Sequence, residues 1–209
     1  MSLRVVLYDD TCRTSRVGGF VAPIGLTHTW IAGSLLYRGR ARADLTRGTT
    51  SWSEGLRAVV DAPGPETISE LQYWGHGKWG RALVRDDVWD RRALDARHAL
   101  APLLDALAAR LAPNARVWFR TCETFGGDEG HAFARELSEF LGATVAGHTF
   151  IIGPWQSGLH TLAPGAQPTW STTEGILEGS PARPVRALWS RPDRPNTITC
   201  LHDTIPDGY

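Results

Sequence analysis

Two apolar runs near the middle of the chain dominate its hydrophobic pattern. The first covers residues 68–74 and stops at Gly75-His76-Gly77, and the second covers residues 115–120 and stops at Thr121-Cys122. Between them, residues 99–111 carry leucines at helical spacing. A strand, a helical crossover and a second strand place the two runs side by side as parallel neighbours.

This arrangement brings one histidine and one cysteine to the same edge of the predicted sheet. Functional residues of open parallel sheets collect beyond the carboxyl ends of the strands, where His76 and Cys122 stand. A thiol needs a base to become the nucleophilic thiolate, and an imidazole supplies one. A lone cysteine after a strand is more often a small buried hydrophobe. The coincidence of the two residues nevertheless favours a cysteine–histidine dyad.

Two further features of the pattern favour the dyad. The glycine after His76, Gly77, leaves its backbone amide open to a substrate oxygen and is a candidate oxyanion donor. A helix that starts near Asp128 points its positive dipole end toward Cys122, which would lower the pKa of the thiol.

The flanking segments predict an α/β protein with a mostly parallel central sheet. Residues 3–8 form a short apolar run typical of a first buried strand, and residues 143–146 predict a further parallel strand. A capping box opens the helix predicted over residues 51–61, and apolar residues at helical spacing predict another over residues 128–141.

The remaining N-terminal pattern is weaker. Residues 11–25 are rich in Gly, Ser, Thr and Arg and predict a loop, and residues 38–50 predict an exposed connection. A helix is expected over residues 27–37, although Gly33 weakens it.

The character of the chain changes after Gly147. Pro, Gly, Trp, Ser and Thr dominate from there, and short strands are expected at residues 159–162 and 197–201. We therefore expect one domain over residues 1–209, with a core of about 1–150 and an irregular Trp- and Pro-rich C-terminal extension of about 151–209 that covers the sheet.

Composition narrows the function classes. The chain has 209 residues, 42% of them hydrophobic and 21% charged, as expected of a globular protein. Zero net charge argues against nucleic-acid binding, and no apolar run approaches the roughly 18 residues that span a bilayer. The N-terminus lacks a signal-peptide pattern, and no CxxC pair occurs among the three cysteines, so a reduced cytoplasmic location is expected. Cys12 and Cys200 are interpreted as structural thiols.

Several motifs together resemble a known family. Gly75-His76-Gly77 ends the first run, Leu-Ala-Pro-Asn-Ala at 111–115 leads into the second, and Thr121-Cys122 ends it. Gly-Gly-Asp-Glu-Gly follows at 126–130, and Phe-Leu-Gly-Ala-Thr-Val-Ala-Gly at 140–147 completes the match. Over about residues 66–150 this layout resembles the caspase-like (clan CD) cysteine peptidases, in particular the bacterial DUF4347-type domain.

The resemblance implies a fold and roles for individual residues. The fold would be a caspase-like three-layer α/β/α sandwich with a mostly parallel central sheet. His76 would act as general acid or base and Cys122 as nucleophile, and the amides of Gly77 and Cys122 would bind the oxyanion. Two features depart from the family: Thr121 stands where a small residue is usual, and the caspase pentapeptide around the nucleophile is absent.

Five other residues are candidates for substrate binding. Asp9 and Asp10 end the first strand on the same edge as the dyad and would select a basic side chain, although loop solvation or helix capping is the commoner role. Glu123 would orient or recognise substrate, and the alternative is a surface carboxylate. Trp79 and Trp155, in loops near the proposed cleft, would form its aromatic walls, whereas most tryptophans pack in cores.

No cofactor or metal is expected from the sequence. The remaining histidines show no metal-ligand spacing, so no zinc site is predicted. They are His28, His98, His131, His148, His160 and His202.

The sequence thus predicts a caspase-like cysteine peptidase that hydrolyses peptide bonds in a peptide or protein substrate, and its oligomeric state stays open. One alternative is a catalytically inactive caspase-like module that binds a protein partner, for which a buried Cys122 or an imidazole turned away from it would be the sign. Another is a cysteine-dependent hydrolase or acyltransferase that acts on a small molecule.

Overall fold

A six-stranded mixed sheet forms the centre of the computed structural model, which describes residues 2–18, 20–64, 67–206 and 208–209. The strands lie in the order β12-β10-β9-β5-β1-β4, and all neighbours are parallel except β12, which is antiparallel to β10. Their bounds are β1 (Leu3–Asp9), β4 (Leu45–Thr49), β5 (Ile68–Trp74), β9 (Leu111–Arg120), β10 (Thr144–His148) and β12 (Leu159–Leu162).

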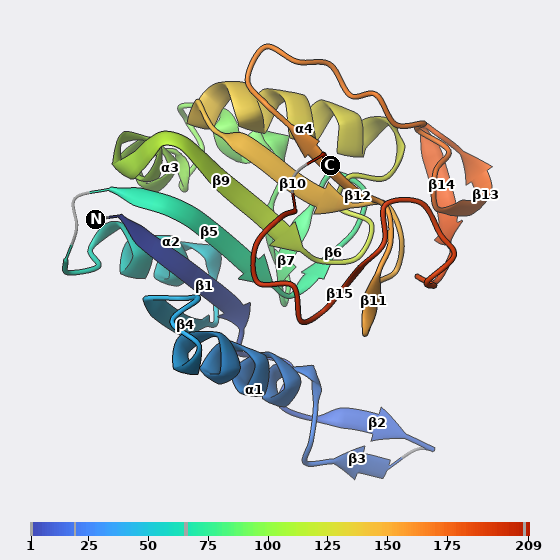
Figure 1. The fold of residues 1–209 in the computed structure, drawn as a ribbon. Coiled ribbons are helices and arrows are strands. Elements are labelled where there is room, and N and C mark those ends of the chain that lie inside the picture. The colour runs from blue at the N-terminus through green and yellow to red at the C-terminus, as the bar shows by residue number, and fades with distance from the viewer. Residues whose placement is uncertain (1, 19, 65–66, 207) are drawn as a thin grey trace.

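Helices cover both faces of this sheet (Figure 1). α2, α3 and α4 lie together on one face, and α1 lies on the other. Their bounds are α1 (Leu26–Gly39), α2 (Trp52–Val60), α3 (Ala101–Arg110) and α4 (Gly127–Leu141). The described chain is therefore an α/β protein with a mostly parallel central sheet, as predicted.

The alternation of side chains along β9 explains why both faces are covered. Val117 and Phe119 belong to the large core beneath α2, α3 and α4, whereas Trp118 and Arg120 point to the opposite face. Trp118 is fully buried there under the C-terminal segment, which contributes Ile198 and Ile205. A strand with apolar side chains on both faces needs cover on both.

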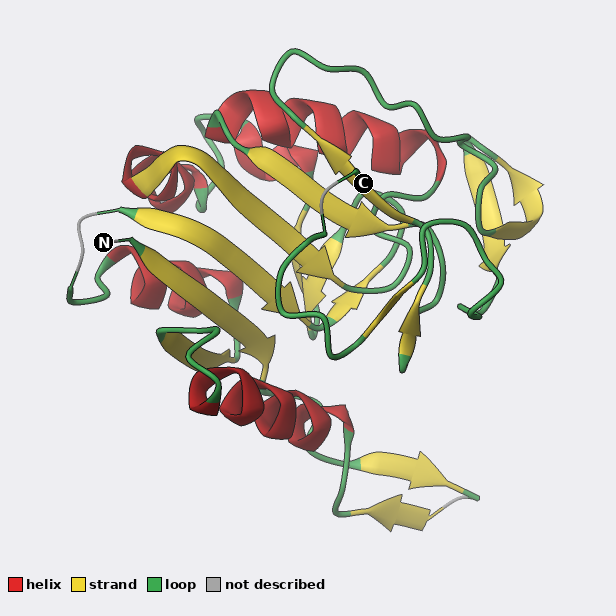
Figure 2. Cartoon of the chain, viewed as in Figure 1, coloured by secondary structure: helices red, strands yellow, loops and turns green. Residues whose placement is uncertain are grey.

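Smaller elements surround the sheet (Figure 2). The hairpin β2–β3 projects from the body beside α1, and a three-stranded sheet, β6-β7-β8, follows β5. The bounds are β2 (Ser15–Val17), β3 (Phe20–Ala22), β6 (His76–Gly77), β7 (Ala82–Val84), β8 (Asp87–Trp89), the 3-10 helix η1 (Arg91–Leu94), β11 (Trp155–Gln156), β13 (Ile176–Ser180), β14 (Arg183–Ala187) and β15 (Ile198–Thr199).

The predicted signals at helix ends are confirmed in their main parts. The Ser51 side chain accepts a hydrogen bond from the Glu54 amide at 3.2 Å and so caps α2, whereas the Glu54 carboxylate accepts from the Thr50 amide at 2.9 Å and so does not complete a capping box with Ser51. Gly142 ends α4 in the left-handed conformation, with a φ of 58°.

Two predicted loops were wrong. The connection predicted over residues 38–50 contains β4, a parallel edge strand beside β1, and the loop over 11–25 contains the β2–β3 hairpin. β4 reads Leu-Thr-Arg-Gly-Thr and is only partly buried, so it lacks the apolar run by which a strand is recognised. Among the described residues, no helix is long and apolar enough to cross a membrane.

His148, at the end of β10, is a fully buried neutral histidine. Its Nε2 accepts a hydrogen bond from the Trp118 indole at 3.3 Å, and its Nδ1 lies 3.3 Å from the Ser157 carbonyl oxygen. Nδ1 therefore carries the proton, and protonation of Nε2 would set two donors against each other. Burial, and then the positive charge of Arg120, lower the pKa of His148 from 6.5 to about 3.

This histidine should make the protein less stable in acid. Below pH 6.5 the unfolded chain takes up a proton at His148, whereas the folded chain does not until the pH nears 3. Stability is therefore lost as the pH falls through that window, by about 1.4 kcal/mol per pH unit from this group. Chemical denaturation between about pH 6 and pH 4 should give a steeper loss for the wild type than for His148→Gln. Equal slopes would contradict a neutral buried His148.

Arg120, the last residue of β9, is a buried cation held by neutral groups. Its guanidinium donates to the Tyr37 hydroxyl at 2.5 Å, to Gln156 Oε1 at 2.9 and 3.1 Å, and to the carbonyl oxygens of Cys200 and His202 at 2.8 Å each. The same group lies 4.4 Å from the ring centre of Trp118. Burial lowers the pKa of Arg120.

Replacement of Arg120 should be costly even when the charge is kept. Arg120→Met leaves several buried oxygens without donors and should cost about 3 kcal/mol of unfolding free energy or more. Arg120→Lys should restore little of the lost stability, because an ammonium group cannot reach all the acceptors that surround the planar guanidinium. Arg97→Met, at an exposed arginine, is the control and should change stability little. A lysine variant as stable as the wild type would contradict this account.

Candidate functional site

The two residues of the predicted dyad follow neighbouring parallel strands. Trp74 of β5 pairs with Arg120 of β9, so the strands end in register and the chain continues from one edge into His76 and Cys122. The predicted parallel arrangement of the two runs is thereby confirmed.

A tight hairpin carries His76. Lys78 and Arg81 exchange backbone hydrogen bonds of 2.9 and 3.2 Å around a two-residue turn in which Trp79 and Gly80 have φ values of 41° and 74°. Positive φ at both central positions is typical of a type I′ turn, where glycine or asparagine is favoured and a bulky residue is strained. Trp79 therefore sits in a conformation that the surroundings must impose.

The tip of this hairpin is fastened to the loop that carries Cys122. The amide of Trp79 donates to the Glu123 carbonyl oxygen at 2.9 Å, and the amide of Gly80 donates to that of Thr124 at 2.8 Å. These bonds hold the turn in its strained form and fix the His76 and Cys122 loops relative to each other.

Gly77 packs directly against the Cys122 loop. A Cβ atom at this position would lie 2.6 Å from Thr121 Oγ1 and closer still to Thr124 Oγ1, so only glycine fits. Hydrogen-bonded and non-hydrogen-bonded pairs alternate along an antiparallel hairpin, and Lys78 and Arg81 form a hydrogen-bonded pair. The next pair, Gly77 and Ala82, is therefore non-hydrogen-bonded, so the Gly77 amide points away from β7. That amide is oriented out of the hairpin, as an oxyanion donor would have to be.

The Cys122 thiol is half-buried. Its Sγ lies 4.0 Å from the Ile152 carbonyl oxygen, and no hydrogen bond joins it to His76 in the part of the chain that the structure describes. Burial raises the pKa of the Cys122 thiol, and the charge of Glu123 adds to that rise. The lowering expected from the α4 dipole is outweighed, because the thiol is withdrawn from water and the helix begins only at Gly127.

His76 instead faces a different cysteine. Its Nε2 lies 3.3 Å from Cys12 Sγ, and the Cys12 thiol lies 3.7 Å from Asp9 Oδ2. The Trp30 ring packs nearly perpendicular to the imidazole, with ring centres 5.7 Å apart. Burial and the Asp9 carboxylate raise the pKa of Cys12.

The sequence reasoning missed Cys12 as a partner of His76. One signal was available: Cys12 follows the end of β1 by three residues, and β1 borders β5 on the side opposite β9. A residue after β5 therefore has a neighbouring loop on each side.

The two acidic residues at the end of β1 already have partners. Asp9 is fully buried, and its Oδ1 accepts hydrogen bonds from the amide and hydroxyl of Thr11 at 2.8 and 2.6 Å. Asp10 forms an ion pair with Arg13 at 2.7 Å. Asp9 thus stabilises its own loop from a buried position.

Glu123, Trp79 and Trp155 are the remaining candidates for substrate binding. Glu123 has a φ of 53°, and burial raises the pKa of its carboxyl group while Lys78 opposes that rise. Trp79 lies under the Lys78 ammonium, 4.2 Å from the ring centre. Trp155, in β11, is 43% exposed.

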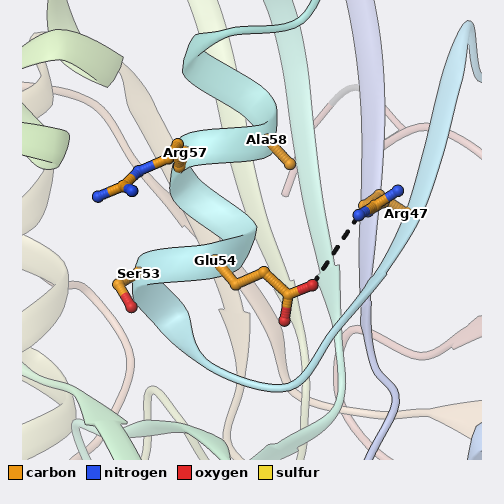
Figure 3. Close-up of a pocket in the computed structure, with 5 residues that line it drawn as sticks. All are labelled: Arg47, Ser53, Glu54, Arg57 and Ala58. Carbon is orange, nitrogen blue, oxygen red and sulfur yellow. Dashed lines mark ion pairs between the residues drawn. The ribbon is translucent and has the colours of Figure 1, made fainter.

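Residues that the structure describes line two surface hollows. One of about 440 Å³ lies between α2 and the edge strand β4, is lined by Arg47, Ser53, Glu54, Arg57 and Ala58, and contains an Arg47–Glu54 ion pair of 3.9 Å (Figure 3). It includes none of the candidate residues. The other, of about 500 Å³, includes Trp79 together with residues of η1 and β14.

Comparisons of the chain with models of protein families, with curated proteins and with solved structures found no match.

Substitution of Gly77 tests how closely the two loops pack. Gly77→Ala should lower the unfolding free energy by about 1–3 kcal/mol, because the new methyl group overlaps the hydroxyls of Thr121 and Thr124. Gly39→Ala, where a Cβ meets nothing within 4 Å at the end of α1, should be neutral or slightly stabilising. Thermal and denaturant unfolding of both variants provide the measurement. A Gly77→Ala protein as stable as the wild type would show that the loops can separate.

Proposed function

We propose that the chain is a caspase-like cysteine peptidase with Cys122 as nucleophile and His76 as general acid and base. The observation that carries the proposal is the pairing of the two loops: they follow adjacent parallel strands, and the amides of Trp79 and Gly80 bind the carbonyl oxygens of Glu123 and Thr124. Strand, His-Gly, crossover helix, strand and Cys is the layout that the sequence resemblance implies for this family.

The reaction balances with the groups available. His76 takes the proton of the Cys122 thiol, the resulting thiolate attacks the peptide carbonyl carbon, and the amides of Gly77 and Cys122 donate to the oxyanion. His76 passes a proton to the leaving amine as the C–N bond breaks and a thioester forms. His76 then takes a proton from water, which attacks the thioester and releases the acid and the Cys122 thiol.

The proposal requires His76 to turn from Cys12 toward Cys122. An imidazole changes its direction by rotation about its two side-chain torsions, and catalytic hydrogen bonds often form only when substrate is bound. The raised pKa of Cys122 fits a resting thiol, which substrate binding and the turned imidazole would activate.

The alternative is a catalytically inactive caspase-like module that binds a protein partner. The contact of His76 with Cys12, together with the position of Cys122 near the Ile152 carbonyl, favours it. Under this alternative, Cys122 never becomes a nucleophile.

Labelling with a substrate-like probe distinguishes the two functions. Peptidyl acyloxymethyl ketones carrying Arg, Asp or Ala next to the ketone should alkylate Cys122, because the peptide part positions the thiol and the imidazole. Iodoacetamide should label the exposed Cys200 first. Mass spectrometry of tryptic peptides identifies the modified residue.

The histidine variant is the matched control for this labelling. His76→Asn should slow labelling of Cys122 by about 100-fold or more, while iodoacetamide still reaches Cys200 at the wild-type rate. Labelling of Cys12 in place of Cys122, or no preference for peptidyl probes over iodoacetamide, would overturn the peptidase and leave the binding module.

A further inference from the structure

Three side chains from two segments of the chain converge at the end of β1. Cys12 Sγ lies 3.3 Å from His76 Nε2 and 3.7 Å from Asp9 Oδ2, and one ligand atom from each residue lies within 4.8 Å of the others. The three groups come from the strand end, the following loop and the first residue of the hairpin after β5.

These groups are a donor set for a transition metal. Thiolate, imidazole and carboxylate are the three protein ligands of zinc, and three of them with a fourth position left to water form an open site. Zinc–ligand bonds of about 2.0–2.3 Å in a tetrahedron separate neighbouring ligand atoms by about 3.3–3.8 Å. The two measured separations from Cys12 Sγ fall in that range.

The carboxylate is oriented before any ion arrives. Both hydrogen bonds from Thr11 go to Asp9 Oδ1, which leaves Oδ2 directed toward the sulfur. Outer partners of this kind fix a ligand in place.

Cys12 is held just as firmly. The buried Thr27 hydroxyl donates to the Asp9 carbonyl oxygen at 2.9 Å and accepts from the Cys12 amide at 3.0 Å. The Thr27 amide in turn donates to the Cys12 carbonyl oxygen at 3.1 Å. The start of α1 therefore fixes the loop that presents the sulfur.

Electrostatics favours an ion at this point. A thiolate and a buried carboxylate that lie side by side repel each other. A divalent cation between them attracts both. The imidazole adds a neutral ligand and no further negative charge.

We propose that Asp9, Cys12 and His76 form a Zn²⁺ site with one position open to water. The sequence did not predict it, because Asp9 and Cys12 stand 64 or more positions before His76 in the chain.

One consequence rests on the proposed peptidase. A metal-bound imidazole has no free lone pair, so zinc on Nε2 would prevent His76 from taking a proton from Cys122 or from water. Zinc would then hold the peptidase inactive.

Direct binding measurements test the site without reference to catalysis. Titration of the reduced wild-type protein with Zn²⁺ against a chromophoric chelator should give one ion per chain. Cys12→Ser, Asp9→Asn and His76→Asn should each weaken binding by about tenfold or more. Cys122→Ser and Cys200→Ser should bind as the wild type does, although the first cannot be a peptidase.

Cobalt identifies the ligands. Co²⁺ should give a thiolate-to-metal charge-transfer band that disappears in Cys12→Ser and persists in Cys122→Ser, with circular dichroism confirming that both variants are folded. Absence of zinc binding, or a band and an affinity unchanged in Cys12→Ser, would overturn the site.

The inhibitory consequence has its own readout. Saturating Zn²⁺ should suppress probe labelling of wild-type Cys122, and a chelator should restore it. Labelling at an unchanged rate on the zinc-loaded protein would refute the inhibition. If no probe labels Cys122 under any condition, the peptidase fails while the metal titrations still decide the site.

Discussion

A single buried cation ties the separate parts of this molecule together. Arg120 ends β9, two residues before Cys122, and its guanidinium reaches α1 through Tyr37, β11 through Gln156, and the C-terminal segment through the carbonyl oxygens of Cys200 and His202. Its hydrogen-bond partners are all uncharged, so the cost of burial is offset by complete donation to fixed dipoles. The buried Arg120 therefore holds α1, β11 and the C-terminal segment on the sheet, because the removal of any of them would leave N–H groups of the guanidinium without acceptors.

The same strand end determines the geometry of the candidate site. Arg120 fixes the exit of β9, and the Cys122 loop that follows is held to the His76 hairpin by the amides of Trp79 and Gly80. The strained turn at Trp79 persists because those two bonds require it. The two loops are therefore fastened to each other, and the His76 imidazole contacts Cys12.

How much of this was predictable depends on the range of each interaction. β5, α3 and the end of β9 follow from apolar periodicity, and Ser51 and Gly142 from backbone hydrogen bonding at helix ends. β4 was missed because a short, partly exposed edge strand needs no apolar run. The partners of His76 and Arg120 were missed for another reason: they are contacts between residues 36 or more positions apart, to a thiol in one case and to side-chain and backbone oxygens in the other, and neither leaves a periodic trace.

The strand order explains why His76 is a candidate both for the catalytic dyad and for the zinc site. β5 lies between β1 and β9, so a side chain that follows it has the loop after β1 on one side and the loop after β9 on the other. Asp9 and Cys12 occupy the first, with a carboxylate and a thiol that suit a metal ion, and Cys122 occupies the second, with a glycine amide nearby that suits an oxyanion. An imidazole cannot bind a metal through its lone pair and accept a proton there at the same time. The two proposed activities of this edge are therefore mutually exclusive states of one side chain.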